Sequence, residues 1–114
     1  MGIDLGTTNS CVGVFGPNGI EIVPNSNGKR TTPSMILFGL KGKIEVGEAA
    51  MKSFGTAPTK VIYDVKRIIG RPRHDPKLQH HIKDCGLKIE SDEFERILIE
   101  VNVGKASAKL YYPE

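Results

Sequence analysis

Tryptophan is absent from this sequence of 114 residues, and aromatic residues make up only 6% of it. A hydrophobic core must therefore be built mainly from aliphatic side chains. Cysteine is also scarce, because the chain holds only Cys11 and Cys85, which are too few for a disulfide scaffold and lack Cys-x-x-Cys spacing. Two reduced thiols are typical of a cytosol-like compartment.

Long hydrophobic runs are missing as well. No apolar segment approaches the ~18 residues of a transmembrane helix, and the first residues lack the basic and apolar regions of a signal peptide. We therefore expect a cytoplasmic or organellar protein without a membrane partner. The hydrophobic and charged fractions, 39% and 25%, are ordinary for a globular protein, and the length allows at most one domain with one modest core.

The net charge of +3 is unevenly distributed. The segment 60–73 alone carries five basic side chains against one acidic side chain, Asp64, whereas residues 1–59 and 74–114 are nearly balanced. A local excess of positive charge favours an anion site over general affinity for nucleic acid, so we expect no nucleic-acid partner.

The first 46 residues have the pattern of short strands that are close in sequence. Small apolar residues alternate with polar ones, and Gly-Pro-Asn-Gly at residues 16–19 is a strong turn signal. We expect a short buried strand over residues 2–5, a tight turn over 6–9, and further strands over 10–15, 20–23, 33–38 and 44–46. Residues 40–43 are expected to form a turn.

The pattern then changes to helix and returns to strand. Residues 47–54 contain helix formers, residues 64–69 predict a short helix that Gly70 ends, and Asp75-Pro76 is typical of an N-cap followed by proline at the first helical position. The third helix is expected to reach about Lys83. Strands are then expected over residues 87–89, 96–101 and 108–112, with a turn at 104–105.

The first candidate site lies in residues 3–10, Ile-Asp-Leu-Gly-Thr-Thr-Asn-Ser. Gly6 lets a ligand approach the backbone, consecutive N–H groups in a tight turn form an anion-binding concavity, and Thr7 and Thr8 add hydroxyl donors. Asp4 would repel a phosphate unless Mg²⁺ or metal-bound water lies between them. The pattern is also compatible with a plain hairpin that has an exposed aspartate. A P-loop and a dinucleotide-binding Gly-x-Gly-x-x-Gly motif are both absent.

The second candidate site is the basic segment around Lys66 and Arg67. Apolar neighbours on both sides should hold at least one of these cationic groups near the body of the protein, where it could orient a terminal phosphate or stabilise charge during phosphate transfer. The alternative is a solvated basic helix face. The three histidines have no partners at metal-site spacing, and we expect them on the surface.

Taken together, these motifs resemble the 70-kilodalton heat-shock chaperones. The similarity lies in the order and spacing of four segments, and a fifth follows at the end. They are residues 3–10 just described, 28–34 (Gly-Lys-Arg-Thr-Thr-Pro-Ser), 46–50 (Val-Gly-Glu-Ala-Ala), 64–71 (Asp-Val-Lys-Arg-Ile-Ile-Gly-Arg) and 111–114 (Tyr-Tyr-Pro-Glu). The resemblance spans essentially the whole chain.

The resemblance implies an α/β fold, a lobe fragment of an actin-like (ribonuclease H-like) ATPase domain. An N-terminal β-hairpin would occupy residues 1–32 and a small mixed α/β subdomain residues 33–114. ATP or ADP and Mg²⁺ are the implied ligands. Unfolded client proteins, a J-domain co-chaperone and a nucleotide exchange factor are the implied partners, through the longer parent protein.

The same resemblance assigns roles to individual residues. Asp4 and Lys66 are implied to be catalytic: Asp4 on the Mg²⁺ shell through water, and Lys66 at the γ-phosphate and attacking water. Arg67 is implied to be a neighbouring structural or ion-pair residue. The implied phosphate-binding residues are Gly6, Thr7, Thr8 and Asn9.

The length also carries an expectation. Compared with the family, the chain would end before the second phosphate loop and the adenine pocket, so we expect weak nucleotide binding and little hydrolysis by the chain alone. Two other functions stay open at this point. One is a truncated interaction module without nucleotide turnover, and the other is a small, self-sufficient ATPase or kinase relative.

Overall fold

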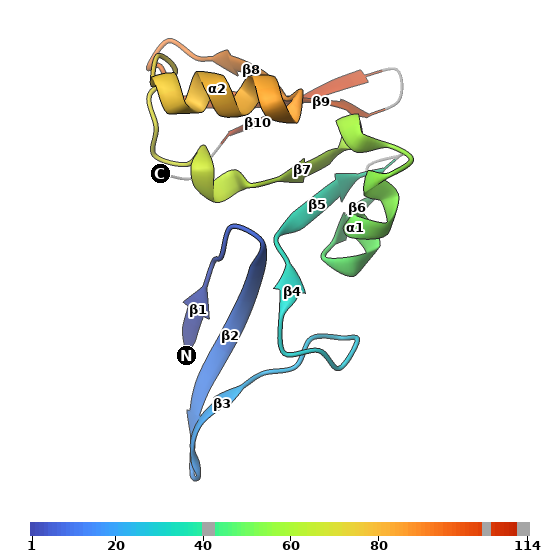
Figure 1. Ribbon diagram of the computed structural model, residues 1–114, viewed down its shortest axis with the longest axis vertical. Coiled ribbons are helices and arrows are strands. Elements are labelled where there is room, and N and C mark those ends of the chain that lie inside the picture. Colours follow the sequence, from blue (N-terminus) through green and yellow to red (C-terminus); the bar gives the residue numbers. More distant parts are fainter. Residues whose placement is uncertain (40–42, 104–105, 112–114) are drawn as a thin grey trace.

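The computed structural model describes residues 1–39, 43–103 and 106–111, arranged as three small antiparallel sheets with two α-helices. The sheets follow one another along the long axis of a molecule that measures 48 × 29 × 22 Å (Figure 1). No helix in the described part of the chain is long and apolar enough to cross a membrane. The turns expected around residues 40–42 and at 104–105, and the final residues 112–114, lie outside the described residues.

The first sheet has four strands. Three of them, which we call the hairpin sheet, are β1 (Gly2–Asp4), β2 (Asn9–Gly16) and β3 (Gly19–Ile22). Both predicted turns are confirmed: residues 5–8 join β1 to β2, so the predicted turn 6–9 ends on the first residue of β2, and the pairing of Gly16 with Gly19 leaves a two-residue turn between β2 and β3. Glycine is suited to position 19, because its φ is +103°.

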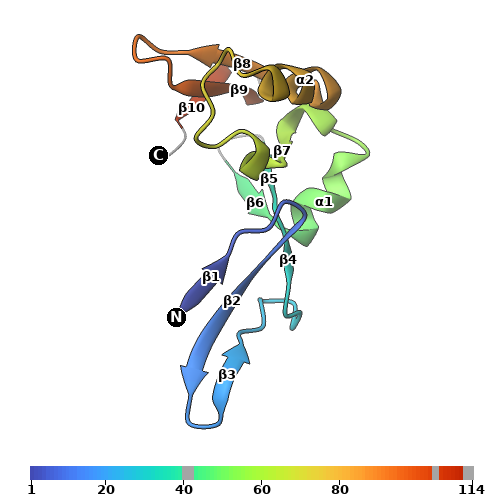
Figure 2. The same cartoon turned by 60° about the vertical axis from the view of Figure 1, so that its left-hand side comes forward.

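The expected burial of the first strand is wrong. Ile3 in β1 is 68% exposed, and the other two residues of the strand are exposed as well. The apolar sequence predicted a buried strand, but β1 is an edge strand that pairs with β2 alone among the described strands. Neither α-helix covers the hairpin sheet in the two views (Figures 1 and 2).

A short connection leads from the hairpin sheet to the second sheet. The strand predicted over residues 33–38 is divided at Ser34 into β4 (Thr32–Pro33), which pairs with the start of β2, and β5 (Met35–Phe38). Strand β5 lies between β6 (Ile44–Val46) and β7 (Val61–Tyr63). The structure thus adds a strand, β7, that the sequence pattern did not indicate.

Helix α1 (Glu48–Phe54) forms where the helix formers of residues 47–54 predicted a helix, and it packs against the second sheet. Leu37, Ala50 and Val61 form a small buried cluster there. The 3₁₀-helix η2 (Pro58–Lys60) leads from α1 towards β7.

The third sheet consists of β8 (Lys88–Ser91), β9 (Ile97–Val103) and β10 (Ala106–Tyr111), and α2 (Pro76–Cys85) packs against it. The predicted cap of α2 is confirmed, because the carboxylate of Asp75 accepts hydrogen bonds from the backbone N–H groups of Lys77 and Leu78 at 2.7 and 3.2 Å. The main core lies between α2 and the sheet. Its buried members are Ile62, Ile68, Leu78, Ile97, Ile99 and Val101.

The helix predicted over residues 64–69 is reduced to one 3₁₀ turn, η3 (Val65–Arg67). Asp64 precedes this turn in the left-handed conformation with φ +56°, and Gly70 follows it with φ +70°. Two left-handed residues so close together leave no room for a longer α-helix.

Candidate functional site

The turn between β1 and β2 is held too tightly for any residue but glycine at position 6. A Cβ atom on Gly6 would overlap the backbone carbonyl oxygen of Asn9 across the turn. The sequence suggested that Gly6 gives a ligand access to the backbone. The structure adds a second reason for glycine at this position, because the backbone of Asn9 fills the space that a side chain would need.

The predicted ligand-binding side chains of this turn are accessible. Thr8 and Asn9 are exposed, and Thr7 is half-buried. Asp4, the last residue of β1, is also exposed and pairs in register with Cys11 of β2. The structure therefore brings the four residues of the turn and Asp4 together at one end of the hairpin sheet.

Ser34 connects this turn to the rest of the molecule. Its backbone N–H donates to the carbonyl oxygen of Thr8 at 2.9 Å, and its hydroxyl donates to the carbonyl oxygen of Gly6 at 2.8 Å. The hydroxyls of Ser10 and Ser34 are 2.8 Å apart. The sequence reasoning gave Ser34 no role. The only available signal was its position directly after Thr-Thr-Pro, where the strand breaks.

Lys66 lies in η3 and is exposed. The arginines near it have partners, since Arg67 forms an ion pair with Asp64 at 3.2 Å and Arg71 forms one with Asp75 at 2.8 Å. Lys66 has no ion pair with any residue that the structure describes. No described acidic residue therefore neutralises its charge, whereas Arg67 is an ion-pair residue as expected.

The turn and Lys66 come from distant parts of the sequence but lie in neighbouring parts of the fold. In both views the tip of the β1–β2 hairpin points towards the yellow-green segment after β7 that holds η3 (Figures 1 and 2). The basic segment thus faces the end of the hairpin sheet that carries residues 6–9.

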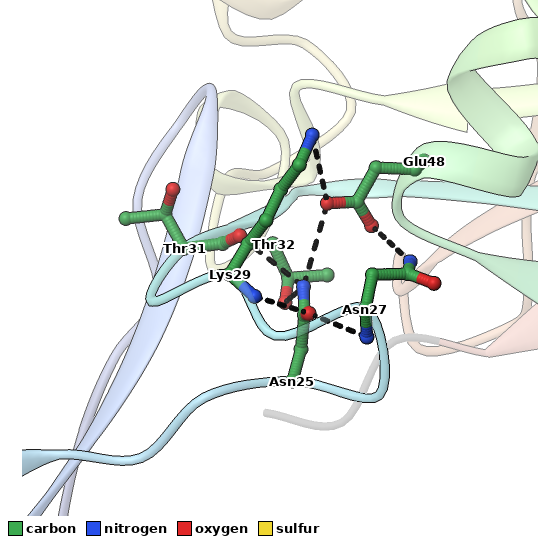
Figure 3. Close-up of polar contacts among 6 residues, drawn as sticks. All are labelled: Asn25, Asn27, Lys29, Thr31, Thr32 and Glu48. Carbon is green, nitrogen blue, oxygen red and sulfur yellow. Dashed lines mark hydrogen bonds and ion pairs between the residues drawn. The ribbon is translucent and has the colours of Figure 1, made fainter.

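A polar network fixes the loop between β3 and β4 (Figure 3). The side-chain oxygen of Asn25 accepts from the backbone N–H groups of Asn27 and Lys29 at 2.9 and 3.0 Å, and its amide donates to the hydroxyl of Thr32 at 3.0 Å. Asn25 and Asn27 also donate to the carboxylate of Glu48, at 3.4 and 3.3 Å. The network holds Thr32, and with it β4, against the first turn of α1.

Electrostatics and close packing also stabilise the contact between β4 and the first turn of α1. The pKa of Glu48 is lowered by a hydrogen bond from its own backbone N–H and by donors from Asn25 and Asn27, so its carboxylate stays ionised at neutral pH. Gly47, before Glu48, is buried with φ +69°, and a Cβ there would come within 2.6 Å of Cγ2 of Thr32. The sequence indicated only a polar loop here.

A pocket outside the candidate phosphate site lies between η3 and α2. It has a volume of about 740 Å³, and Arg67, Arg71, Asp84 and Cys85 are among its lining residues. Acidic and basic groups are mixed in this lining, and neither Lys66 nor residues 6–9 belong to it. This pocket is therefore separate from the candidate phosphate site.

Two groups at this cavity are held in their neutral forms. A hydrogen bond with Cys85, burial and nearby negative charge raise the pKa of Tyr63 to about 12. Burial raises the pKa of the Cys85 thiol, whose Sγ lies 3.3 Å from Nε2 of His81. Two of the histidines, His74 and His80, are exposed as expected, whereas His81 is half-buried.

The site offers one carboxylate to a metal ion. Within residues 1–39, 43–103 and 106–111, no group of three or more histidine, cysteine, aspartate or glutamate side chains is arranged to hold a metal. Asp4 alone fits Mg²⁺ only where phosphate oxygens and water supply most of the ligands. The threonine hydroxyls of the turn, and Lys66 with no ion pair among the described residues, are groups that can bind an anion.

One comparison with known proteins covers the whole sequence. The family model described as Hsp70 protein matches residues 1–114.

Proposed function

The chain belongs to the Hsp70 family, and on that premise we propose that its residues 6–9 bind the phosphates of ATP and that Lys66 faces the γ-phosphate. Members of this family are ATP-binding chaperones with an actin-like ATPase fold, and the mixed α/β chain with antiparallel sheets is consistent with part of that fold. The specific roles of the turn and of the lysine are our proposal.

The observation that carries this proposal is that Lys66 has no ion pair with any described residue, while the segment that holds it faces the tip of the hairpin (Figures 1 and 2). An ammonium group of this kind, near an accessible turn rich in N–H and hydroxyl donors, is electrostatically suited to a polyanion. Fixed donors of this kind stabilise negative charge without reorganising as it develops, which is how a phosphate site contributes to phosphoryl transfer.

Within this site the residues have different tasks. Backbone N–H groups of residues 6–9 and the hydroxyls of Thr7 and Thr8 bind and orient the phosphates. Asp4 would hold Mg²⁺ through water, and the ion, when bound, would neutralise phosphate charge that Asp4 would otherwise repel. Lys66 orients the terminal phosphate.

We propose binding with little turnover for this chain. Hydrolysis needs a positioned water as well as charge stabilisation, and the described residues around the turn supply one carboxylate and one lysine. Coupling to unfolded clients, a J-domain co-chaperone and an exchange factor, in the cytoplasm or an organelle, is proposed only for a longer protein that carries this segment.

The test is a titration of the ¹⁵N-labelled chain with Mg·ATP, Mg·ADP and AMP, followed by amide chemical shifts. We expect shifts at residues 7–9 that grow with the number of phosphates. Lys66→Met should weaken Mg·ATP binding about tenfold, because one charge-assisted contact is lost. Lys60→Met is the matched control, since Lys60 belongs to the same basic segment and has no ion pair with the described residues.

Equal effects of the two lysine variants would contradict the role of Lys66. An absence of shifts at residues 7–9 in the unmodified chain would contradict phosphate binding by the turn. That result would favour an interaction module without nucleotide.

A further inference from the structure

Ser34 makes an unusual set of contacts for a residue between two short strands. It binds two of the four carbonyl groups in the candidate phosphate turn, those of Gly6 and Thr8, through its hydroxyl and its backbone N–H. It sits directly after β4, which pairs with the start of β2 and is held by the network around Asn25. Ser34 therefore connects two carbonyl groups of the turn directly to the chain that leads into β5.

The direction of the hydrogen bonds follows from counting protons. A serine hydroxyl has one proton to donate, and the carbonyl oxygen of Gly6 can only accept. The hydroxyl proton of Ser34 is therefore committed to Gly6. In the 2.8 Å contact between the two hydroxyls, Ser10 must then be the donor and Ser34 the acceptor. The result is a directed chain from Ser10 through Ser34 to Gly6.

These contacts also fix where the amides of the turn point. The C=O and N–H of a planar trans peptide point in opposite directions, and the described residues contain no cis peptide. Because the carbonyl of Gly6 points towards Ser34, the N–H of Thr7 points away from it. The same reasoning makes the N–H of Asn9 point away from Ser34, since the carbonyl of Thr8 is bound by the backbone of Ser34.

We propose that Ser34 is a positioning residue of the phosphate site, and that Ser10 orients the Ser34 hydroxyl. Ser34 touches no ligand itself. By holding two carbonyls on one side of the turn, it presents the amides of Thr7 and Asn9 on the other side, ready to bind phosphate oxygens without a rearrangement. This inference rests on the proposed function of the turn.

The two contacts of Ser34 can be separated experimentally. Ser34→Ala removes the hydroxyl bond to Gly6 but keeps the backbone bond to Thr8. The amide of Thr7 should therefore lose more of its response to Mg·ATP than the amide of Asn9. We expect the dissociation constant to rise about fivefold, the equivalent of one neutral hydrogen bond. Ser10→Ala should have a smaller effect, because Ser34 still reaches Gly6.

Two further variants control for general damage. Ser34→Thr keeps a hydroxyl and should retain affinity and the Thr7 response. Ser53→Ala removes another serine hydroxyl that bonds a backbone carbonyl, that of Ala49, on α1 and should leave phosphate binding unchanged. The thermal midpoint and the amide spectrum of β5 and β7 report whether each variant is folded.

The outcomes separate this inference from the proposed function. Suppose that the unmodified chain binds Mg·ATP. Ser34 is then not a positioning residue if Ser34→Ala binds Mg·ATP equally well, or if it loses the Thr7 and Asn9 responses to the same extent. In either case the proposed function stands. If the unmodified chain shows no response at residues 7–9, the proposed function fails and the role of Ser34 fails with it. A selective loss at Thr7 that Ser34→Thr restores supports the proposal.

Discussion

Two regions of the molecule are stabilised in different ways. One is the hairpin sheet, and the other, which we call the upper part, consists of the second and third sheets with α1 and α2. All the buried hydrophobic residues that the structure describes lie between Leu37 and Val101, whereas the hairpin sheet exposes large apolar side chains, with Phe15 84% and Ile20 78% exposed. The upper part is held by burial of aliphatic side chains, and the hairpin sheet by backbone pairing and by its connection through Ser34. The candidate phosphate turn thus belongs to the region with the least buried core.

This contrast is tested most strongly by comparing two side-chain truncations. Leu78 of α2 is fully buried in the main core, so Leu78→Ala should lower the free energy of unfolding by about 2–5 kcal/mol. Ile20→Thr in β3 keeps a β-branched residue on an exposed face and should change it by less than about 0.5 kcal/mol. Urea unfolding monitored by circular dichroism measures both values. Similar losses would show that the hairpin sheet has a buried core of its own.

The second prediction concerns two glycines of the hairpin sheet. Gly6→Ala forces a Cβ into the carbonyl oxygen of Asn9, so the turn must change shape and the response of residues 7–9 to Mg·ATP should be lost. The free energy of unfolding should change far less than in Leu78→Ala, because the upper core is untouched. Gly2→Ala is the matched control, since nothing lies within 4 Å of a Cβ at that position. If Gly6→Ala retains the response, the shape of the turn does not determine binding.

The same contrast explains how far the sequence could predict the structure. Three signals that act within a few residues were reliable: the Asp75 cap of α2, the turn at residues 16–19, and the tight turn after β1 form as predicted. The local helix signal over residues 64–69 was not, because a left-handed residue at each end limits it to one 3₁₀ turn. Burial of β1 was predicted wrongly, because burial depends on an element that covers the strand, and composition cannot supply that information. The strand β7 was missed because residues 61–63 are too short to show a period.

The candidate site also has some residues that local motifs could identify and others that only the three-dimensional structure shows. The residues of the turn and Lys66 could be selected from local motifs, but the pairing of Arg67 and Arg71, which leaves Lys66 without an ion pair among the described residues, is visible only in three dimensions. Ser34 could not be assigned a role from sequence, because its contacts join residues 24 to 28 positions apart. Long-range contacts of this kind have no local pattern.

The smallest expected effect is a loss of stability at alkaline pH, which should begin in the upper part and not in the hairpin sheet. Tyr63 lies in the upper part, and its pKa is raised to about 12 by its hydrogen bond with Cys85, by burial and by nearby negative charge. Its pKa is about 10 in the unfolded chain, so the folded state holds the proton more tightly. The resulting stability is fully present below about pH 10 and is lost as the pH rises towards about 12.

Tyr63→Phe keeps the ring, whose centroid lies 5.0 Å from that of Phe54, but removes the titrating group. The thermal midpoint of the variant should therefore fall less steeply than that of the unmodified chain between pH 10 and 12. An absorbance titration at 295 nm should at the same time lose its latest component. Because no tyrosine lies in residues 1–33, amide signals of the upper part should respond to this titration before those of the hairpin sheet. The opposite order would mean that alkaline unfolding begins in the hairpin sheet and that Tyr63 does not control it.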